Sequence, residues 1–423
     1  MGEKTVVVIP YGSDVADDRG SHDIRPELRY CPIHLYCFLM RRADSLYFRP
    51  DGKAIGNVFR KTALMSSIPP VSVLMTVYNA EPFLDEAIKS ILGQSFGDFE
   101  FIIIDNASTD GSREMLASCS DSRLRVFHNT ENIGPPRALN RGLQMAKGEY
   151  VARMDADDVA LPDRLVKQFD FMARNPDCAV AGTQIRLFDH NGKKIYVPWM
   201  PVTQDEIRWK LMFTSPLAHS SVMMRKDCVL EVDGYDERFR YAPDYDLWSR
   251  LILQGHRLAN LLDFLALIRI HGIADGVTAL QADLIDEVAR ISARNINECL
   301  NFRVAPDEAR KMVLLVNYHR CPAEDVSAAL KMLGRIAWAC AAMMGRQVEA
   351  YYGRTLVRLA MSPGEISPLE RIRLFAKGLR LVVCGTDPSE RYRFLKDWVL
   401  TGRFIGAIRI AWWRSALRSS RNG

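Results

Sequence analysis

The stretch "VSVLMTVYNAEPFLDEAIKSILGQSFGDFEFIIID", residues 71–105, carries the pattern that decides the fold. It begins and ends with short apolar runs rich in β-branched residues, which predict buried strands at 71–77 and 99–105. Between them, Pro82 can occupy the first turn of a helix, and apolar residues recur at helical spacing up to Leu92. A strand, a helix and a strand in this order predict a parallel βαβ unit.

The same alternation continues after this unit. "LRVFH" (124–128) and "YVARMD" (150–155) predict two further strands, and "PPRALNRGLQMAKG" (135–148) predicts a helix that Gly148 ends. Pro162 can open another helix that runs to about residue 173. We therefore expect an α/β fold with a mostly parallel sheet flanked by helices.

Two changes of character divide the chain. Residues 1–69 are uneven and end at the Pro-rich "IPP", which interrupts regular structure, so they form an extension whose role the sequence leaves unknown. The sheet-forming pattern occupies residues 70–275. Residues 276–423 show an almost entirely helical pattern interrupted by prolines, which predicts an all-α C-terminal region.

The bulk composition is that of an ordinary globular protein. The 423 residues are 48% hydrophobic and 25% charged, and the modest net charge of +5 does not indicate a nucleic-acid partner. The nine cysteines show no C-x-x-C pair, which argues against a zinc site and a disulfide framework and favours a reducing compartment. There is no apolar run of about 18 residues and no signal-peptide pattern at the start, so we expect a cytoplasmic location.

Polar clusters follow three of the predicted strands: "TVYNAE" (76–81), "DNASTDGS" (105–112) and "DADD" (155–158). In an open parallel sheet, ligands bind beyond the carboxyl ends of the strands, so these clusters are expected to form one site. Asp155 and Asp157 are two residues apart and can point at one Mg²⁺ ion, which prefers carboxylates and substrate phosphates as ligands. The alternative is a solvated acidic turn in which Asp158 caps the next helix.

The other candidates in these clusters also have two interpretations. Asp105 could accept a hydrogen bond from a nucleobase, or it could stabilise its own turn. Tyr78 and Asn79 could contact a nucleotide or simply form the turn. Arg137 lies in the first turn of a predicted helix, where a cation is unfavourable. This position fits a contact with a phosphate or nucleotide, although a surface arginine is the alternative.

A second focus lies in "YAPDYDLWSRLILQG", residues 241–255. Asp244 and Asp246 begin a strongly apolar helix, and each could cap it or serve as a general base near a reacting centre. His271 follows a probable strand and could reach the same edge of the sheet. An isolated histidine such as His271 or His219 is more often a structural residue than a ligand.

Three segments together resemble a family 2 glycosyltransferase of the GT-A fold, over about residues 70–272. They are the stretch from "VSVLMTVYNAE" to "DNASTDGS", "NIGPPRALNRGLQMAKGEYVARMDADD" and "APDYDLWSRL". The resemblance implies transfer of a sugar from a nucleotide diphosphate sugar, usually UDP-linked, to an acceptor hydroxyl with inversion. It also implies Mg²⁺ or Mn²⁺ as the cofactor. The expected role is in bacterial-type surface polysaccharide or glycolipid synthesis.

The resemblance also assigns roles to individual residues. The nucleotide-sugar site would contain Thr76, Tyr78, Asn79, Glu81, Asp105, Arg137 and Asp155. Asp105 would bind the uracil edge, Asp157 of the D-x-D motif would bind the metal, and His271 would lie at the diphosphate as a further metal ligand. Asp244 would be the catalytic base. The family often has Glu-Asp before "YDLW" whereas this chain has Pro243-Asp244, so Asp246 is the fallback.

Two other classes of function compete with this interpretation. A nucleotidyltransferase would usually show a Gly-rich basic phosphate loop early in the domain, which "TVYNAE" is not. A non-catalytic scaffold on a transferase fold would not need the aspartates at 155, 157 and 244.

The last stretch, residues 403–423, carries five arginines and no acid. It could form a basic amphipathic helix at the inner face of a membrane, near a lipid-linked acceptor, or pack on the protein. The acceptor is therefore expected to be a saccharide or a lipid-linked saccharide.

Overall fold

The computed structural model describes residues 68–189, 194–196, 199–270, 279–318, 321–345, 347–361 and 366–385. All of them belong to one of two compact units, Ser67–Gly423. The predicted N-terminal extension up to residue 67, His271 and the basic tail at 403–423 lie outside the described residues.

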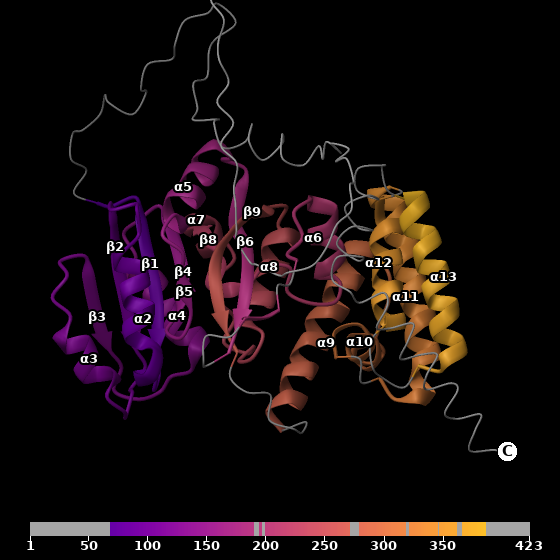
Figure 1. Cartoon of the computed structure of the whole chain (residues 1–423), viewed down its shortest axis with the longest axis horizontal. Helices are drawn as coiled ribbons and strands as arrows, with labels where there is room; N and C mark the ends of the chain where they lie inside the picture. The colour runs from indigo at the N-terminus through magenta and orange to yellow at the C-terminus, as the bar shows by residue number, and fades with distance from the viewer. Residues whose placement is uncertain are drawn as a thin grey trace, which may run out of the picture. The chain divides into compact units, whose positions relative to one another are not determined.

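One sheet of nine strands organises the first part of this unit (Figure 1). The strands are β1 Val71–Val77, β2 Phe99–Asp105, β3 Leu124–His128, β4 Tyr150–Asp155, β5 Val159–Ala160, β6 Cys178–Phe188, β7 Lys194–Tyr196, β8 Met223–Arg225 and β9 Arg257–Arg269. The first four have the boundaries that the sequence predicted.

The order of the strands is β3-β2-β1-β4-β8-β6-β9-β5, with β7 paired to β6. The strands β3, β2, β1 and β4 are parallel. Because β8 is antiparallel to both β4 and β6, strands β6 and β9 point the same way as β4, and only β5, β7 and β8 run against them. The sheet is thus mixed but mostly parallel, which confirms the predicted α/β fold class.

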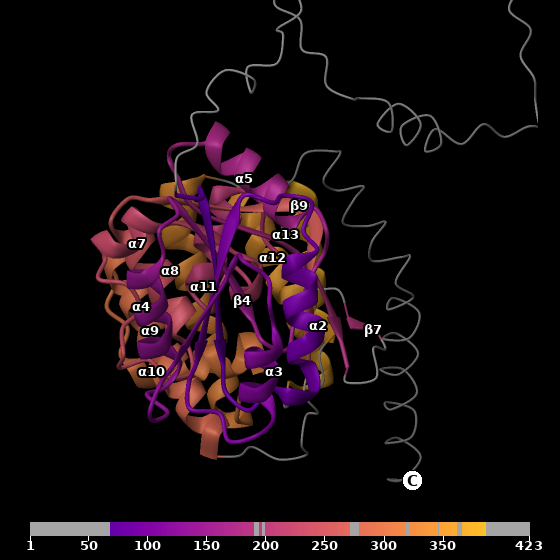
Figure 2. The same ribbon diagram turned by 90° about the vertical axis from the view of Figure 1, so that its left-hand side faces the viewer.

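Helices cover both faces of the sheet, as Figure 2 shows. Alternate residues of β1 and β2 face opposite ways, so that Leu74 and Ile102 belong to one apolar cluster and Val73 and Ile103 to the other. The first cluster includes residues of α4 Pro135–Met145, α6 Gln204–Leu211, α7 Lys226–Glu231 and α8 Pro243–Leu253. The second includes residues of α2 Glu81–Leu92, α3 Ser112–Ser118 and α5 Arg164–Arg174.

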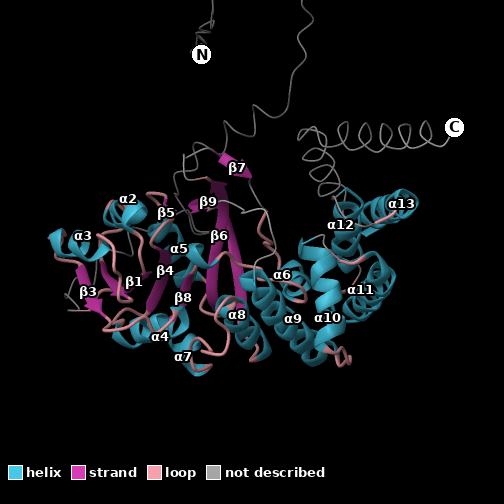
Figure 3. Cartoon of the chain, turned by 90° about the horizontal axis from the view of Figure 1, so that it is seen from below, coloured by secondary structure: helices cyan, strands magenta, loops and turns pink. Residues whose placement is uncertain are grey.

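The region beyond residue 278 is helical in its described parts, as predicted (Figure 3). Its helices are α9 Ala279–Leu300, α10 Pro306–Val313, the π-helical turn Leu314–Tyr318, α11 Ala323–Met344, α12 Gln347–Met361 and α13 Pro368–Gly385. They form an apolar cluster of their own, which also takes in Trp209, Met212 and Phe213. The helix α9 further contributes Val288 and Ile291 to the cluster on the sheet. The two regions therefore share buried apolar side chains.

Within the part of the chain that the structure describes, one helix, α11, could cross a membrane by length and composition. Of its most apolar window, 39% is buried against the rest of the protein. On its exposed side, Trp338 is 79% and Met343 64% accessible. Core helices of soluble proteins meet the same criterion, so this finding is weak evidence for a span.

Candidate active site

The reversal of strand order places the three predicted clusters together. The chain runs outward from β1 through β2 to β3 and then returns to β4 on the other side of β1. Ligands of open α/β sheets bind at such a reversal, beyond the carboxyl ends of the strands. Here Thr76 lies opposite Asp155, and Val77 lies opposite Asp105. The residues after β1, β2 and β4 therefore lie together at one edge of the sheet, as the sequence predicted.

Asn79 and Glu81 connect the loop after β1 to the loop after β2. Asn79 has a positive φ of 51°, and its Oδ1 accepts hydrogen bonds from the backbone N–H (2.8 Å) and the hydroxyl (3.3 Å) of Thr109. The Glu81 carboxylate accepts from the N–H of Gly111 at 2.9 Å, while its own N–H donates to Asp110. Both predicted nucleotide-site residues thus hold the loop after β1 against the loop after β2.

Asp105 lies at the end of β2 with a fully buried carboxylate. Its Oδ1 accepts from the N–H of Ser108, and its Oδ2 contacts Arg113 Nη2 at 2.9 Å and His128 Nδ1 at 2.8 Å. Burial opposes ionisation, but hydrogen bonds from His128, Ser108 and Arg113 outweigh it and lower the pKa of Asp105. The side chains of Arg113 and His128 are themselves 46% and 43% exposed.

The remaining nucleotide candidates are Thr76 and Tyr78 at the end of β1 and Arg137 at the start of α4. Thr76 is partly buried in β1 beside Asp155, and Tyr78 is 51% exposed just after the strand. An exposed aromatic ring in this position can stack on a base. Arg137 lies in the first turn of α4, as predicted. Its guanidinium forms an exposed ion pair with Glu237 at 3.4 Å.

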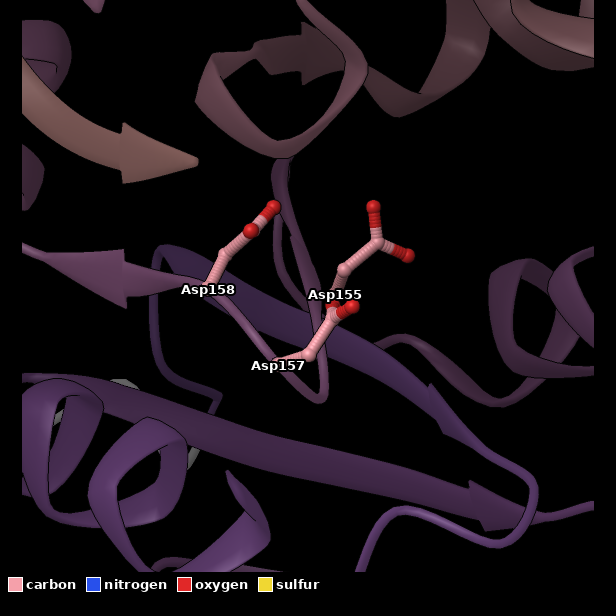
Figure 4. Close-up of side chains that lie close together, drawn as sticks. All are labelled: Asp155, Asp157 and Asp158. Carbon is pink, nitrogen blue, oxygen red and sulfur yellow. The ribbon is translucent and has the colours of Figure 1, made fainter. Parts of the chain in front are cut away.

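Three aspartates lie close together at the end of β4 and in the turn that follows it (Figure 4). One carboxylate oxygen from each of Asp155, Asp157 and Asp158 lies within 4.8 Å of the others. Burial opposes ionisation of Asp155, but the charges of Arg153 and His219 and a hydrogen bond from Ser220 help to lower its pKa. Arg153 forms an ion pair with Asp155 and is buried in β4. Part of the charge between these aspartates is therefore balanced by an arginine on the same strand.

Asp158 differs from its two neighbours. It is only 3% exposed, and its carboxylate accepts from the backbone N–H of Arg269 at 2.7 Å. Burial, together with the charges of Asp155 and Asp157, raises the pKa of Asp158 to about 8. Arg269 also donates to the carbonyl of Asp157 at 2.9 Å and so fixes the turn against β9. Asp158 is therefore a structural residue of the acidic turn.

The acidic turn fits a hard divalent cation. Its donor atoms are carboxylate oxygens, the ligands that Mg²⁺ and Mn²⁺ prefer. Asp155 and Asp157 are both partly exposed on the turn, whereas Asp158 is buried. The second predicted ligand, His271, is outside the described residues.

Asp244 and Asp246 occupy the first turn of α8 but have different surroundings. Asp244 is partly exposed, accepts from the hydroxyl of Ser215 at 3.1 Å, and has a pKa raised by burial. Asp246 is fully buried, with one oxygen 2.7 Å from Arg250 and the other 2.7 Å from Arg294. A carboxylate held by two arginines is a poor proton acceptor, so the surroundings favour Asp244 over Asp246 as a base.

Arg153 and Tyr235, which were not candidates from the sequence, lie in the site, together with His219, which the sequence favoured as a structural residue. His219 lies beside Tyr235, with Nε2 2.7 Å from the Tyr235 hydroxyl, and burial and then the charge of Arg153 lower its pKa well below the usual range. Burial raises the pKa of Tyr235, and the charges of Asp244 and Asp155 raise it further. His219 precedes Ser220, whose hydroxyl donates to Asp155, so Tyr235 lies near the acidic turn. Only Arg153 had a local signal, since it lies two residues before Asp155 and so on the same face of β4.

Comparison with known proteins identifies the family. The model of the family described as "Glycosyl transferase family 2" matches residues 72–231. The O-antigen biosynthesis glycosyltransferase WbnJ of Escherichia coli is 36% identical over 216 residues, which are 50% of this chain and 83% of WbnJ. EpsE of Bacillus subtilis (strain 168) is 37% identical over 211 residues, or 48% of this chain and 74% of EpsE.

The chain therefore belongs to glycosyl transferase family 2, and it is a glycosyltransferase. This confirms the resemblance found in the sequence motifs. Among solved structures, Staphylococcus aureus TarS residues 1–349 in complex with UDP aligns with a TM-score of 0.45 at 20% identity, over 74% of this chain and 88% of that chain. A likeness of this degree carries no argument about ligands.

Proposed function

We propose that this glycosyltransferase moves a sugar from a nucleotide diphosphate sugar, most simply a UDP-sugar, to an acceptor hydroxyl with inversion. One observation carries the proposal. The short segment 215–221 contacts both groups: the Ser220 hydroxyl donates to Asp155 of the acidic turn at 2.6 Å, and the Ser215 hydroxyl donates to Asp244 at the start of α8 at 3.1 Å. A candidate donor-binding turn and a candidate base are therefore held by one stretch of chain, as a single-step displacement requires.

The donor would bind at the edge of the sheet formed by the carboxyl ends of β1, β2 and β4. Tyr78 would stack on the base, and Asp105 would act at its edge, directly or through the Arg113 and His128 side chains that it orients. Asp155 would face the nucleotide. Asn79 and Glu81 would keep the two loops in place, with Thr76 beside them. Arg137 would lie at the rim near the base.

The residues of the acidic turn support Mg²⁺ or Mn²⁺ as the cofactor, held by Asp157 with His271 as a proposed second ligand. When bound, such an ion acts as a Lewis acid that stabilises charge on the leaving diphosphate. The chain's own contribution is to fix the turn. Arg269 holds the carbonyl of Asp157 and the carboxylate of Asp158, so that the backbone that carries the Asp157 side chain is fixed.

Asp244 would carry out the proton transfer. As the acceptor oxygen forms its bond to the anomeric carbon, its proton passes to the Asp244 carboxylate, and the bond from that carbon to the diphosphate oxygen breaks. Burial raises the pKa of Asp244, which makes it a stronger base than an ordinary aspartate. Ser215 donates to Oδ2 of Asp244 and limits its rotation.

A thermal-shift screen of UDP-, GDP- and dTDP-sugars with Mn²⁺ tests the donor class. A ligand at about 100 times its Kd stabilises the folded state by about 2.7 kcal/mol, so the correct donor is expected to raise Tm by several degrees. The shift should shrink with a chelator and in Asp157→Ala, but not in Asp163→Ala, an exposed aspartate at the start of α5. A screen in which no nucleotide sugar shifts Tm, with or without metal, would contradict the proposal.

The acceptor and the location follow from the relatives and the tail. WbnJ is named for O-antigen biosynthesis. AmsE of Erwinia amylovora, which is 31% identical to this chain over 202 residues, is named for amylovoran biosynthesis. We propose a cytoplasmic enzyme of surface polysaccharide or glycolipid synthesis, with residues 70–275 as its catalytic domain and 276–423 as a helical region. Its acceptor would be a saccharide or a lipid-linked saccharide.

Peripheral membrane contact through residues 403–423 has its own test. The basic, Trp-containing stretch should bind anionic lipid through charge and apolar area. Flotation with vesicles containing phosphatidylserine should carry the full chain, and much less of a chain truncated after residue 401. Equal flotation of both forms would remove the membrane proposal and leave the transferase proposal intact.

A further inference from the structure

The helix that carries Asp244 is held at its start by a residue far away in the sequence. In α8, the N-cap residue Ala242 provides no side-chain hydrogen bond, although the free N–H groups of a helix start need acceptors. The carboxylate of Glu287 in α9 supplies acceptors for the loop that leads into the helix. It accepts from the N–H groups of Arg240 at 2.9 Å, Tyr241 at 2.8 Å and Ala242 at 2.9 Å.

A second contact from α9 fixes the first turn of α8 itself. Arg294 lies 2.7 Å from Asp246, whose other oxygen is bound by Arg250 of the same helix. Arg250 in turn donates to the carbonyl of Gly234 at 2.6 Å, next to Tyr235. The two buried carboxylates, Glu287 at 5% and Asp246 at 0% exposed, thus tie α8 to α9 on both sides of Asp244.

We propose that Glu287 is a positioning residue for the transfer reaction, and that α9 sets the place of the base Asp244. The inference rests on the proposed function and extends it to the helical region. It gives this region a defined task, which is to hold the loop 240–242 and the first turn of α8 in the geometry that Asp244 needs.

The chemistry of the contact explains why a carboxylate is needed. Two oxygens of Glu287 share three donors, with Oε1 facing one N–H and Oε2 facing two. A glutamine has one oxygen and one NH₂ group, so one side of the contact would place a donor against a donor. The loop would then shift to relieve the unsatisfied pair. A displacement of about 1 Å at a reacting group can cost about 100-fold in rate.

Glu287 also lines an open pocket, which raises a competing explanation. The pocket has a volume of about 900 Å³, and its lining includes Tyr241, Asp283, Asp286 and Arg290. If Glu287 instead contacted a saccharide acceptor there, its substitution would weaken acceptor binding without affecting Asp244. Hydrolysis of the donor separates the two explanations, because water is then the acceptor and no saccharide occupies the pocket.

The experiment compares Glu287→Gln with wild type in two assays on the full chain. The first measures UDP affinity with Mn²⁺ by calorimetry, and the second measures the rate of nucleoside diphosphate release by hydrolysis of the donor that gives the largest thermal shift. We expect UDP affinity within about twofold of wild type and a fall in hydrolytic kcat of about 10- to 100-fold, from displacement of the base. Wild-type hydrolysis would overturn the inference, as would a loss confined to UDP affinity.

Asp286→Asn is the matched control. Asp286 precedes Glu287 in α9, lines the same pocket and pairs with Arg310 at 2.7 Å on the surface, but it has no hydrogen bond to the loop at 240–242 among those recorded for the described residues. It should leave hydrolysis and UDP affinity unchanged. A fall in hydrolysis equal to that of Glu287→Gln would trace the effect to pocket charge and overturn the inference.

Glu287→Asp keeps the negative charge but withdraws it by one methylene, and it should give a hydrolytic kcat between wild type and Glu287→Gln. If Glu287→Gln does not fold, Glu287→Asp decides alone, since wild-type hydrolysis in it would contradict the positioning role. Asp244→Asn, measured in parallel, separates a failure of the base assignment from a failure of the positioning role of α9. Wild-type hydrolysis in Asp244→Asn refutes the base assignment itself, whereas wild-type hydrolysis in Glu287→Gln alone refutes only the role of α9.

Discussion

At the scale of single residues, each of the carboxylates Asp105, Asp155 and Asp158 has a charged or hydrogen-bonding partner. Asp155 is paired with Arg153 of its own strand, Asp158 with the backbone of Arg269 in β9, and Asp105 with groups from β3 and α3. Each carboxylate is a site candidate from its type and its place after a strand. The partners of Asp105 and Asp158 come from other elements, whose positions the sequence does not reveal, whereas Arg153 lies two residues before Asp155 in the same strand.

Asp105 provides a test of this arrangement at the residue scale. Its ionised form is stabilised in the folded chain, because hydrogen bonds from His128, Ser108 and Arg113 outweigh burial and lower its pKa. The stabilisation is present above the unfolded pKa of about 3.9 and is lost as the pH falls through the lower folded value. Asp105→Asn should therefore lower the free energy of unfolding at neutral pH by about 1.5–3 kcal/mol and flatten its fall in acid.

Thermal or urea melts of wild type and Asp105→Asn between about pH 3 and 7 measure this difference. Asp98→Asn is the control, because Asp98 is exposed just before β2 and should change stability by less than about 0.5 kcal/mol. Parallel curves for wild type and Asp105→Asn across the acid range would show that Asp105 is not a stabilising carboxylate.

At the scale of elements, the sequence predicts strands well and helix ends less well. The four parallel strands have the predicted boundaries, since each is rich in apolar residues and is followed by a turn-forming segment. The helix predicted to end at Gly148 ends at Met145, because Ala146 already has an extended backbone. Gly148 is needed for another reason: a Cβ there would lie 2.6 Å from the backbone nitrogen of Ser72 in β1. Such a close approach of two chain segments has no signature in local sequence.

The helix pair α12 and α13 depends on a similar approach. A Cβ on Gly353 would lie 2.7 Å from the carbonyl oxygen of Gly378, which is a backbone atom and cannot turn away. Gly353→Ala should separate the two helices and lower the free energy of unfolding by about 1–3 kcal/mol. Thermal melts measure this loss.

The control for this prediction is Gly334→Ala in α11, where the added Cβ would meet only the Tyr352 hydroxyl at 3.3 Å. Alanine favours helix over glycine by about 1 kcal/mol, so Gly334→Ala should be neutral or stabilising. Equal melts for both variants would show that the glycine contact does not limit the packing of α12 on α13.

At the scale of the whole molecule, the sequence predicts a catalytic region and a helical region but not their dependence on each other. The sequence shows that Pro243 replaces the acidic residue that the family often has before Asp244. It does not show that Glu287 contacts the loop before α8 or that Arg294 contacts α8 itself. These contacts join residues more than forty positions apart in the chain. Hydrophobic period and turn residues report local structure, and they do not identify which distant helix covers a given face.

A truncation tests whether the helical region is separable. Removing residues 276–423 would expose Trp209, Met212 and Phe213, which pack among the C-terminal helices, and would remove Glu287 from the loop before α8. We expect residues 67–275 to aggregate or to melt without a cooperative transition, because a large apolar patch is exposed. Size-exclusion chromatography and calorimetry measure this. A monodisperse fragment with a cooperative melt and donor turnover would contradict the dependence.

The central claim is that Asp244 is the base of a metal-assisted transfer from a nucleotide sugar. The most direct measurement is nucleoside diphosphate release in Mn²⁺ by wild type and Asp244→Asn, together with the UDP affinity of each. The account predicts equal UDP affinity and a rate lower by about 10²–10⁴-fold in Asp244→Asn, the usual contribution of a general base. Release at the wild-type rate by Asp244→Asn would contradict it.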